Sequence, residues 1–212
     1  MVLVTAGSET TSTQLSGLTY LLLSNPDAME RAKREVRSAY KSADEITLST
    51  IDRMPFLVAC MNEALRCYPP VVSGIAREAP KGGSTVAGKF VAPGTIVEVQ
   101  NWSMNHSRMH WEDPWAFKPE RFLHGAEAAE SGKKSMRDNM EAFNPFSTGP
   151  RNCLGRNLAY AEMRLIFARL IYQFDLSLVN EEGDWIKKQR AFSFWEKKPL
   201  NIRLTPVADA KL

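Results

Sequence analysis

The segment from Phe146 to Gly155 constrains the fold most, because it places a single cysteine between two glycines directly before a helical pattern. It reads Phe-Ser-Thr-Gly-Pro-Arg-Asn-Cys-Leu-Gly. The apolar spacing that follows predicts a long helix from about Leu154 to Phe174. Cys153 would then lie at a helix N-terminus, where unpaired N–H groups and the helix dipole favour a thiolate. This arrangement presents sulfur to a metal; the alternative is a buried structural cysteine before an ordinary helix.

Five positions of this loop, Phe146, Gly149, Arg151, Cys153 and Gly155, resemble the F-x-x-G-x-R-x-C-x-G haem-binding loop of the cytochrome P450 superfamily. In that family a cysteine thiolate holds the haem iron, so the resemblance makes Cys153 the metal ligand. Gly149 would allow a positive φ, and Gly155 would let the chain approach the porphyrin. Arg151 offers a planar donor fork that suits a haem propionate. Phe146 would shield the sulfur from water.

A second motif, Ala6-Gly-Ser-Glu-Thr-Thr11, lies near the start of the chain on a predicted helix. It resembles the oxygen-activating segment of the same family's central helix. The resemblance implies that Thr10 hydrogen-bonds the oxygen bound at the iron and that Glu9 relays protons to it. The alternative is a polar helix face whose threonines bond back to the preceding turn.

Glu63 and Arg66 lie three residues apart on a predicted helix and are therefore neighbours on its surface. Glu63 shares its face with apolar residues and with both Cys60 and Cys67, so its carboxylate should point into the core and need partners. Arg66 is one partner and Arg121 is the second candidate. The pattern resembles the family's E-x-x-R and P-E-R-F elements, which stabilise the core behind the haem.

Arg77 follows the Pro69-Pro70 helix stop on a short predicted strand. In the family an arginine here reaches a haem propionate; the alternative is a solvated charge at a strand edge. His106 resembles a position near the propionates in some members. That His106 has no role at the haem is an equally open interpretation. His110 and His124 complete the three histidines, none of which has metal-ligand spacing.

Composition excludes several classes of protein. The 212 residues carry a net charge of +3 with scattered basic residues, which gives no reason to expect nucleic acid as a partner. Three cysteines without framework spacing argue against a disulfide scaffold and fit a reducing environment. No apolar run is long enough to span a membrane. Without a linker, residues 1–212 are predicted to form a single, partial domain.

The expected fold class is mainly α with a minor β-sheet. Met1 opens directly into a helical pattern, which suggests that the chain starts inside an element. The expected elements are a helix to about Ser24, a charged surface helix capped by Asn25 and ending near Lys41, and a turn capped by Thr47. After these we expect a helix from Pro55 to Pro69 and a hairpin that pairs 86–91 with 96–100 across Ala92-Pro93-Gly94. An irregular loop should follow at 125–145, and short strands should form the tail around Gly183. The last helix should bury a stripe made of Leu158, Ala161, Leu165, Ala168 and Tyr172.

By resemblance, the chain is the truncated C-terminal half of a cytochrome P450, beginning within the central oxygen-activating helix. The family inserts one atom of dioxygen into a small lipophilic substrate, using haem and electrons from NADPH through a partner reductase. Substrate contacts would come from the first helix, Val71 to Ile75 and the turn at Ala191 to Phe194. The phrasing of Lys81 to Thr85 and Trp195 to Leu200 resembles fungal secondary-metabolism members.

The resemblance also implies a place at the cytosolic face of the endoplasmic reticulum membrane, for the full-length form only, because this chain has no anchor of its own. Two other functional hypotheses stay open: an inactive fragment, and a haem-thiolate isomerase of peroxides. The intact Glu9-Thr10 pair argues against the isomerase, whose chemistry needs no proton relay.

Overall fold

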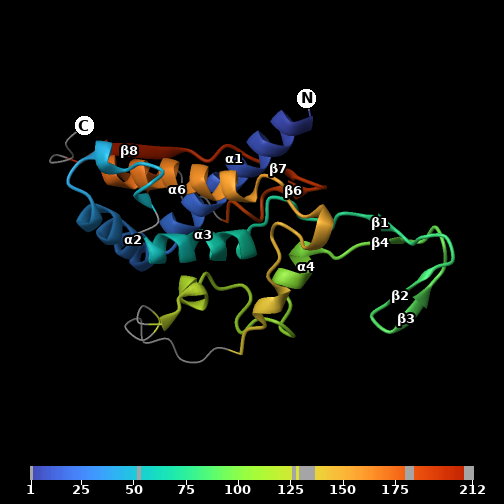
Figure 1. Cartoon of the computed structure of the whole chain (residues 1–212). Helices are drawn as coiled ribbons and strands as arrows, with labels where there is room; N and C mark the ends of the chain where they lie inside the picture. Colours follow the sequence, from blue (N-terminus) through green and yellow to red (C-terminus); the bar gives the residue numbers. More distant parts are fainter. Residues whose placement is uncertain (1, 52–53, 126–127, 129–136, 180–183, 208–212) are drawn as a thin grey trace.

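Four helices form the body of the molecule in the computed structural model, which describes residues 2–51, 54–125, 128, 137–179 and 184–207. They are α1 (Val2–Leu23), α2 (Pro26–Ala39), α3 (Pro55–Cys67) and α6 (Arg156–Gln173). Figure 1 shows α1, α2 and α6 gathered around α3, with the shorter α4 (Asn101–Asn105) beyond its end. Within the described ranges, short 3₁₀ turns are also present: η1 (Ala43–Glu45), η3 (Pro119–Phe122), η4 (Met140–Ala142) and η5 (Gly149–Arg151). The mainly helical fold is as predicted.

Helix α3 is the centre of the core. Proline at its first position and the Pro69-Pro70 stop give it the bounds that the sequence predicts. Ten of its residues are buried, including Glu63, Arg66 and both Cys60 and Cys67. The two cysteines are free thiols, as expected for small core residues. Helix α1 packs closely at Gly17, where a Cβ atom would lie only 2.3 Å from the ring of Tyr68, the residue that follows α3.

The cap predicted for α2 is wrong, whereas its predicted surface position is confirmed. Asn25 makes no capping bond to the helix that it precedes. Its side chain instead donates to the Leu21 carbonyl of α1, at 2.7 Å, because that open helix end lies within reach. The helix lies at the surface with most faces charged, as predicted, and buries one apolar side at Met29, Ala32 and Val36.

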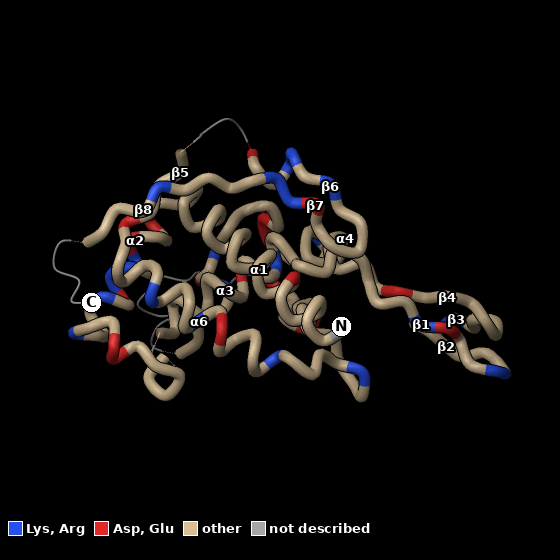
Figure 2. The backbone as a smooth tube through the Cα atoms, turned by 90° about the horizontal axis from the view of Figure 1, so that it is seen from above, with Lys and Arg blue, Asp and Glu red and all other residues tan. Residues whose placement is uncertain are grey.

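The predicted pairing of 86–91 with 96–100 is also wrong. β2 (Ser84–Val86) pairs with β3 (Lys89–Val91) across Ala87 and Gly88, whose φ angles of 49° and 77° suit a two-residue hairpin turn. The turn at Pro93-Gly94 instead directs β4 (Ile96–Val97) onto β1 (Arg77–Glu78). Figures 1 and 2 show these strands as an arm that projects from the helical body.

The last helix begins two residues later than predicted, and its buried stripe differs. Ala168 and Tyr172 are buried as expected, whereas Leu158 is 62% exposed and Ala161 and Leu165 are half-buried. The buried positions are Met163, Phe167, Ala168, Ile171 and Tyr172. Burial is therefore concentrated in the C-terminal half of α6, where the helix packs into the bundle.

The tail forms two antiparallel pairs. β5 (Phe174–Leu178) pairs with β8 (Ile202–Pro206), and β6 (Arg190–Ala191) pairs with β7 (Trp195–Glu196). The expected turn residue Gly183 lies outside the described residues. Trp195 fixes the tail to the core by donating to the Pro69 carbonyl at 2.8 Å and stacking on Tyr68. Within the described ranges, no helix combines the length and apolar character needed to cross a bilayer.

Candidate functional site

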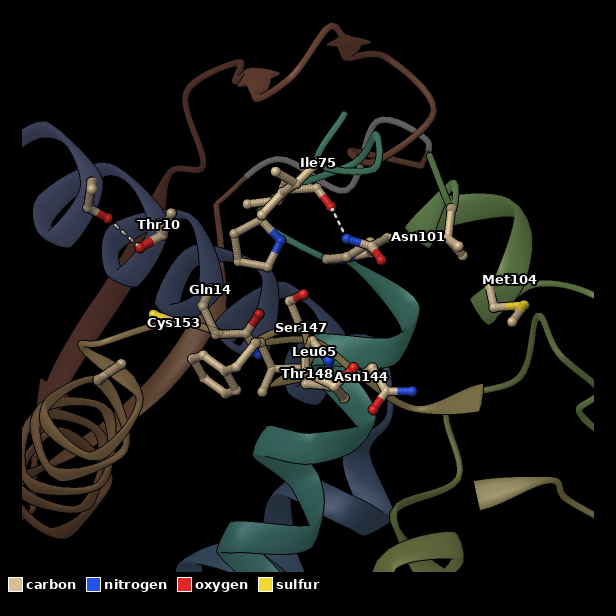
Figure 3. A pocket seen from close by; sticks show the side chains of 18 of the residues that line it. Thr10, Gln14, Leu65, Ile75, Asn101, Met104, Asn144, Ser147, Thr148 and Cys153 are labelled. Atoms are coloured by element: carbon tan, nitrogen blue, oxygen red, sulfur yellow. Dashed lines mark hydrogen bonds between the residues drawn. The ribbon is translucent and has the colours of Figure 1, made fainter. Parts of the chain in front are cut away.

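A cavity of ≈ 520 Å³ lies where α1, the segment after α3, strand β1 and the cysteine loop meet. It is within the usual size range of ligand sites. Five predicted site residues line it: Thr10, Arg77, Phe146, Arg151 and Cys153. Figure 3 shows Thr10 and Cys153 approaching this space from different elements. We refer to it as the Cys153 cavity.

The loop holds Cys153 through backbone geometry. The Cys153 N–H donates to the Phe146 carbonyl at 2.9 Å, which closes the loop on itself. Gly149 has φ 77°, as predicted for a position that favours glycine. Cys153 lies two residues before Gly155, which precedes the first residue of α6. Its thiol is exposed, so the alternative of a buried structural cysteine is wrong.

Gly155 faces the thiol, and Phe146 lies in the same loop. A Cβ atom on Gly155 would lie 3.9 Å from Cys153 Sγ, in ordinary contact and facing the sulfur. The half-buried Phe146 ring packs 5.3 Å from Tyr160, between ring centroids. Tyr160 is held in turn by its hydroxyl, which donates to Asn62 Oδ1 at 2.7 Å. The wall beside the cysteine is therefore fixed to α3.

Two arginines that are far apart in the sequence line the same cavity. Arg77 is exposed on β1, and its guanidinium donates to the carbonyl of the adjacent Ala76 at 3.3 Å. Arg151 is exposed on η5. In the described part of the chain, neither arginine pairs with a carboxylate. Both cations are thus available to an anionic group in the cavity.

The motif on α1 is divided between two faces of the helix. Thr10 lines the cavity and donates to the Ala6 carbonyl at 2.7 Å, the back-bond expected of a helical threonine. Glu9 points elsewhere: Lys197 and Thr13 both donate to its carboxylate. The hydrogen bond from Lys197 lowers the pKa of Glu9 from its usual range, against a smaller opposing effect of burial. Glu9 does not line the cavity.

The predicted Glu63–Arg66–Arg121 cluster is formed and is fully buried. Arg66 donates to both carboxylate oxygens of Glu63, each at 2.8 Å, and Arg121 Nε donates to Oε1 at 3.2 Å. Backbone carbonyls at Asn105 and Pro114 accept from Arg66 at 2.8 and 2.7 Å.

Asp138 is a fourth member of this cluster that the sequence did not reveal. Arg121 Nη1 donates to both of its oxygens at 2.7 Å, and its side chain is 5% exposed. Two carboxylates thereby balance two guanidiniums. Asp138 lies in a loop without periodicity, so no sequence signal marked it. We call Glu63, Arg66, Arg121 and Asp138 the buried ion cluster.

His106 stacks between two tryptophans and does not line the cavity. Its ring lies 4.0 Å from Trp102 and 4.4 Å from Trp115, between centroids. Burial lowers the pKa of His106 to about 4, despite the hydrogen bond between Nδ1 and the Trp102 carbonyl. His110 lies near Asn139, and His124 is exposed. The structure favours a structural role for His106.

Comparison with known proteins shows the family of the chain. The family model for cytochrome P450 matches residues 1–203, and the chain belongs to that family. It is 48% identical over 206 residues to the cytochrome P450 monooxygenase tpeC of Talaromyces stipitatus, covering 97% of this chain and 39% of that protein. Cytochrome P450 monooxygenase 1 of Neocamarosporium betae is 45% identical, covering 97% and 41%. The chain thus spans about two fifths of the length of these fungal relatives.

Proposed function

We propose that the whole protein is a haem-dependent monooxygenase and that Cys153 is its iron ligand. The observation that carries the proposal is the meeting at a single cavity of one exposed thiol and two arginines that have no carboxylate partner among the described residues. The relatives that match the chain are named as monooxygenases, which supports the same reaction class.

The residues of the cavity fit a haem. A haem is a flat apolar macrocycle with two carboxylates at one edge and a metal at its centre. The cavity offers a thiol for the metal, cations at Arg77 and Arg151 for the carboxylates, and apolar side chains such as Leu65 and Met163 for the ring. The small Gly155 next to Sγ leaves the approach to the sulfur open.

Each residue then has a defined task. Cys153 would ligate the iron as a thiolate, with its backbone fixed by the bond to Phe146. Arg77 and Arg151 would bind the propionates, and Phe146 would keep water from the sulfur. When bound, the haem supplies the oxygen chemistry, in which one atom of dioxygen enters a C–H or double bond of the substrate.

Proton delivery would fall to α1. Thr10 lines the cavity, and rotation about its Cβ–Oγ1 bond would turn its hydroxyl proton from the Ala6 carbonyl toward a ligand. Glu9, next in sequence and paired with Lys197, would return protons from the surface. The substrate would be small and lipophilic, contacted by Val71, Ile75 and Phe194. Electrons from NADPH would arrive through a reductase at the endoplasmic reticulum membrane.

Replacing the proposed ligand tests the proposal. In the full-length protein, Cys153→Ser is expected to abolish the carbon monoxide difference spectrum characteristic of a thiolate ligand. Cys60→Ala removes a thiol that is fully buried in α3, and should leave that spectrum in place. A normal thiolate spectrum in Cys153→Ser would refute the assignment.

A further inference from the structure

Four of the five tryptophans lie on one continuous path of ring contacts. The path starts at Trp185, whose ring centroid is 5.5 Å from that of Tyr68, and continues with Tyr68 stacked on Trp195 at 4.5 Å. Trp102 lies 5.4 Å from Trp195 and 6.0 Å from Trp115, again between centroids. All four distances are within the range of direct aromatic contact. We call Trp195, Trp102 and Trp115 the tryptophan chain.

The inner end of the tryptophan chain is attached to the wall of the Cys153 cavity. Trp195 directly follows Phe194, and Phe194 lines the cavity. Trp102 directly follows Asn101, which lines the cavity too. The indole N–H of Trp195 donates at 2.8 Å to the carbonyl of Pro69, a third lining residue. The chain therefore begins immediately behind the residues that a haem would contact.

The outer end of the chain is open to water. Trp115 is 67% exposed, whereas Trp195 is 8% exposed. An indole ring gives up an electron more readily than most side chains, and its N–H then becomes strongly acidic. The N–H of Trp195 is bonded to a backbone carbonyl, which is too weak a base to take that proton. Water can take it from Trp115, so the loss of an electron is stabilised best at the exposed end.

Tyr68 does not compete as the place where an electron is lost. A phenol is oxidised readily only when its hydroxyl proton can leave. The Tyr68 hydroxyl donates at 2.6 Å to Gln189 Oε1, an amide oxygen that is a poor base. Burial also raises the pKa of Tyr68 above its usual range. The favoured direction from the cavity is therefore along the tryptophans to the surface.

We propose that the tryptophan chain conducts oxidising equivalents from a haem in the Cys153 cavity to the surface at Trp115. The proposal rests on the proposed function and adds a protective activity to it. The oxidant is a peroxide, which oxidises the haem by two electrons and is itself reduced to water. When no substrate is present, Trp115 returns one electron to the haem through Trp102 and Trp195, and its indole proton passes to water. A reductant in solution, such as ascorbate, then restores Trp115 by supplying an electron, and water returns the proton.

Two substitutions test the chain in the full-length, haem-loaded protein. Hydrogen peroxide is added without substrate, and frozen samples are examined by electron paramagnetic resonance for a tryptophan radical, which ring-deuterated tryptophan identifies. Trp115→Phe removes the end of the chain, and Trp102→Phe removes its middle while leaving Trp115 in place. Phenylalanine keeps an aromatic ring at each position but is much harder to oxidise. Both variants should lose the radical, and peroxide should bleach their haem severalfold faster.

Trp111→Phe is the matched control, because Trp111 packs against Phe122 and Phe143 and not along the chain. It should keep the wild-type radical. A tryptophan signal of wild-type size in Trp115→Phe or in Trp102→Phe would overturn the proposal, and so would the absence of a tryptophan radical in the wild type. Trp115 is exposed, so Trp115→Phe is expected to fold even if Trp102→Phe does not.

A second measurement needs no haem. In the haem-free full-length protein, a ruthenium photo-oxidant is attached to the exposed thiol of Cys153, whereas Cys60 and Cys67 are buried. After a light flash with an electron acceptor in solution, the oxidised ruthenium takes an electron from the protein. Transient absorption should then show a tryptophan radical that Trp115→Phe lacks, and an equal signal in that variant would overturn the proposal. Failure of the haem assignment is a separate outcome, visible as a missing thiolate spectrum.

Discussion

The buried ion cluster and the Cys153 cavity are both built around arginines, and they differ in how those arginines are satisfied. In the cluster, Arg66 and Arg121 are matched by two carboxylates and by backbone carbonyls, with no exposed charge. At the cavity, Arg77 and Arg151 are exposed and have no carboxylate partner among the described residues. The first region is complete within the chain, and the second is arranged to receive an anion.

This difference separates stability from function. A buried ion pair that is fully hydrogen-bonded adds little over a well-packed apolar core, but breaking it is costly because a buried charge is left alone. The cluster should therefore affect whether the protein folds. The cavity arginines are already solvated, so their removal should affect how well the protein retains haem and not whether it folds.

Breaking the cluster should have the largest effect on stability. Glu63→Ala leaves two fully buried guanidiniums without their shared carboxylate, at an expected cost of about 3–5 kcal/mol. The free energy of unfolding in urea of the full-length protein measures this loss. Glu30→Ala is the matched control, because it removes an i,i+3 ion pair with Lys33 at the surface of α2 and should cost less than about 0.5 kcal/mol. A loss below about 1 kcal/mol in Glu63→Ala would contradict the distinction between the two regions.

The same contrast shows how far sequence could predict this molecule. The Glu63–Arg66 pair follows from helical spacing, and the bounds of α3 follow from prolines at both ends. Asp138 could not be found, because it enters the cluster from a loop whose position depends on tertiary contacts.

The errors in the fold have related causes. The predicted hairpin joined neighbours in sequence, whereas β4 pairs with the more distant β1 and the tighter Ala87-Gly88 turn forms the hairpin. Periodicity located α6 but not its buried stripe, because the extent of burial depends on how far the neighbouring helices reach. Local signals predicted the helices well, and contacts between distant segments less well.

A pH titration tests the structure next to the buried ion cluster. His106 adjoins Asn105, whose carbonyl accepts from Arg66. Burial lowers the pKa of His106 to about 4. His106 therefore stays neutral in the folded protein at pH values where the same side chain in the unfolded chain, with a pKa near 6.5, is already protonated. Stability should therefore fall as the pH drops from about 6.5 to about 4, by up to about 3 kcal/mol.

Replacing the histidine should remove this dependence. His106→Phe keeps an aromatic ring between Trp102 and Trp115, so the part of the pH dependence between about 6.5 and 4 should shrink in urea unfolding curves. The exposed His124→Gln is the control and should leave the curve unchanged. An identical pH dependence in His106→Phe and wild type would show that the stack is not what resists the proton.

The smallest effect on stability is expected at the Cys153 cavity, where a substitution should change haem retention instead. Arg151→Leu removes a charged donor from the cavity, and the loss of one charge-assisted hydrogen bond should speed the release of haem to an acceptor protein about tenfold. Unfolding of the haem-free protein in urea should change by less than about 0.5 kcal/mol, since the side chain is exposed. Arg203→Leu, at an exposed position on β8, should change neither measurement. Unchanged haem release in Arg151→Leu would contradict the assignment of the cavity arginines as an anion site. A loss of stability in the haem-free variant would show that Arg151 has a structural role, as the arginines of the buried ion cluster do.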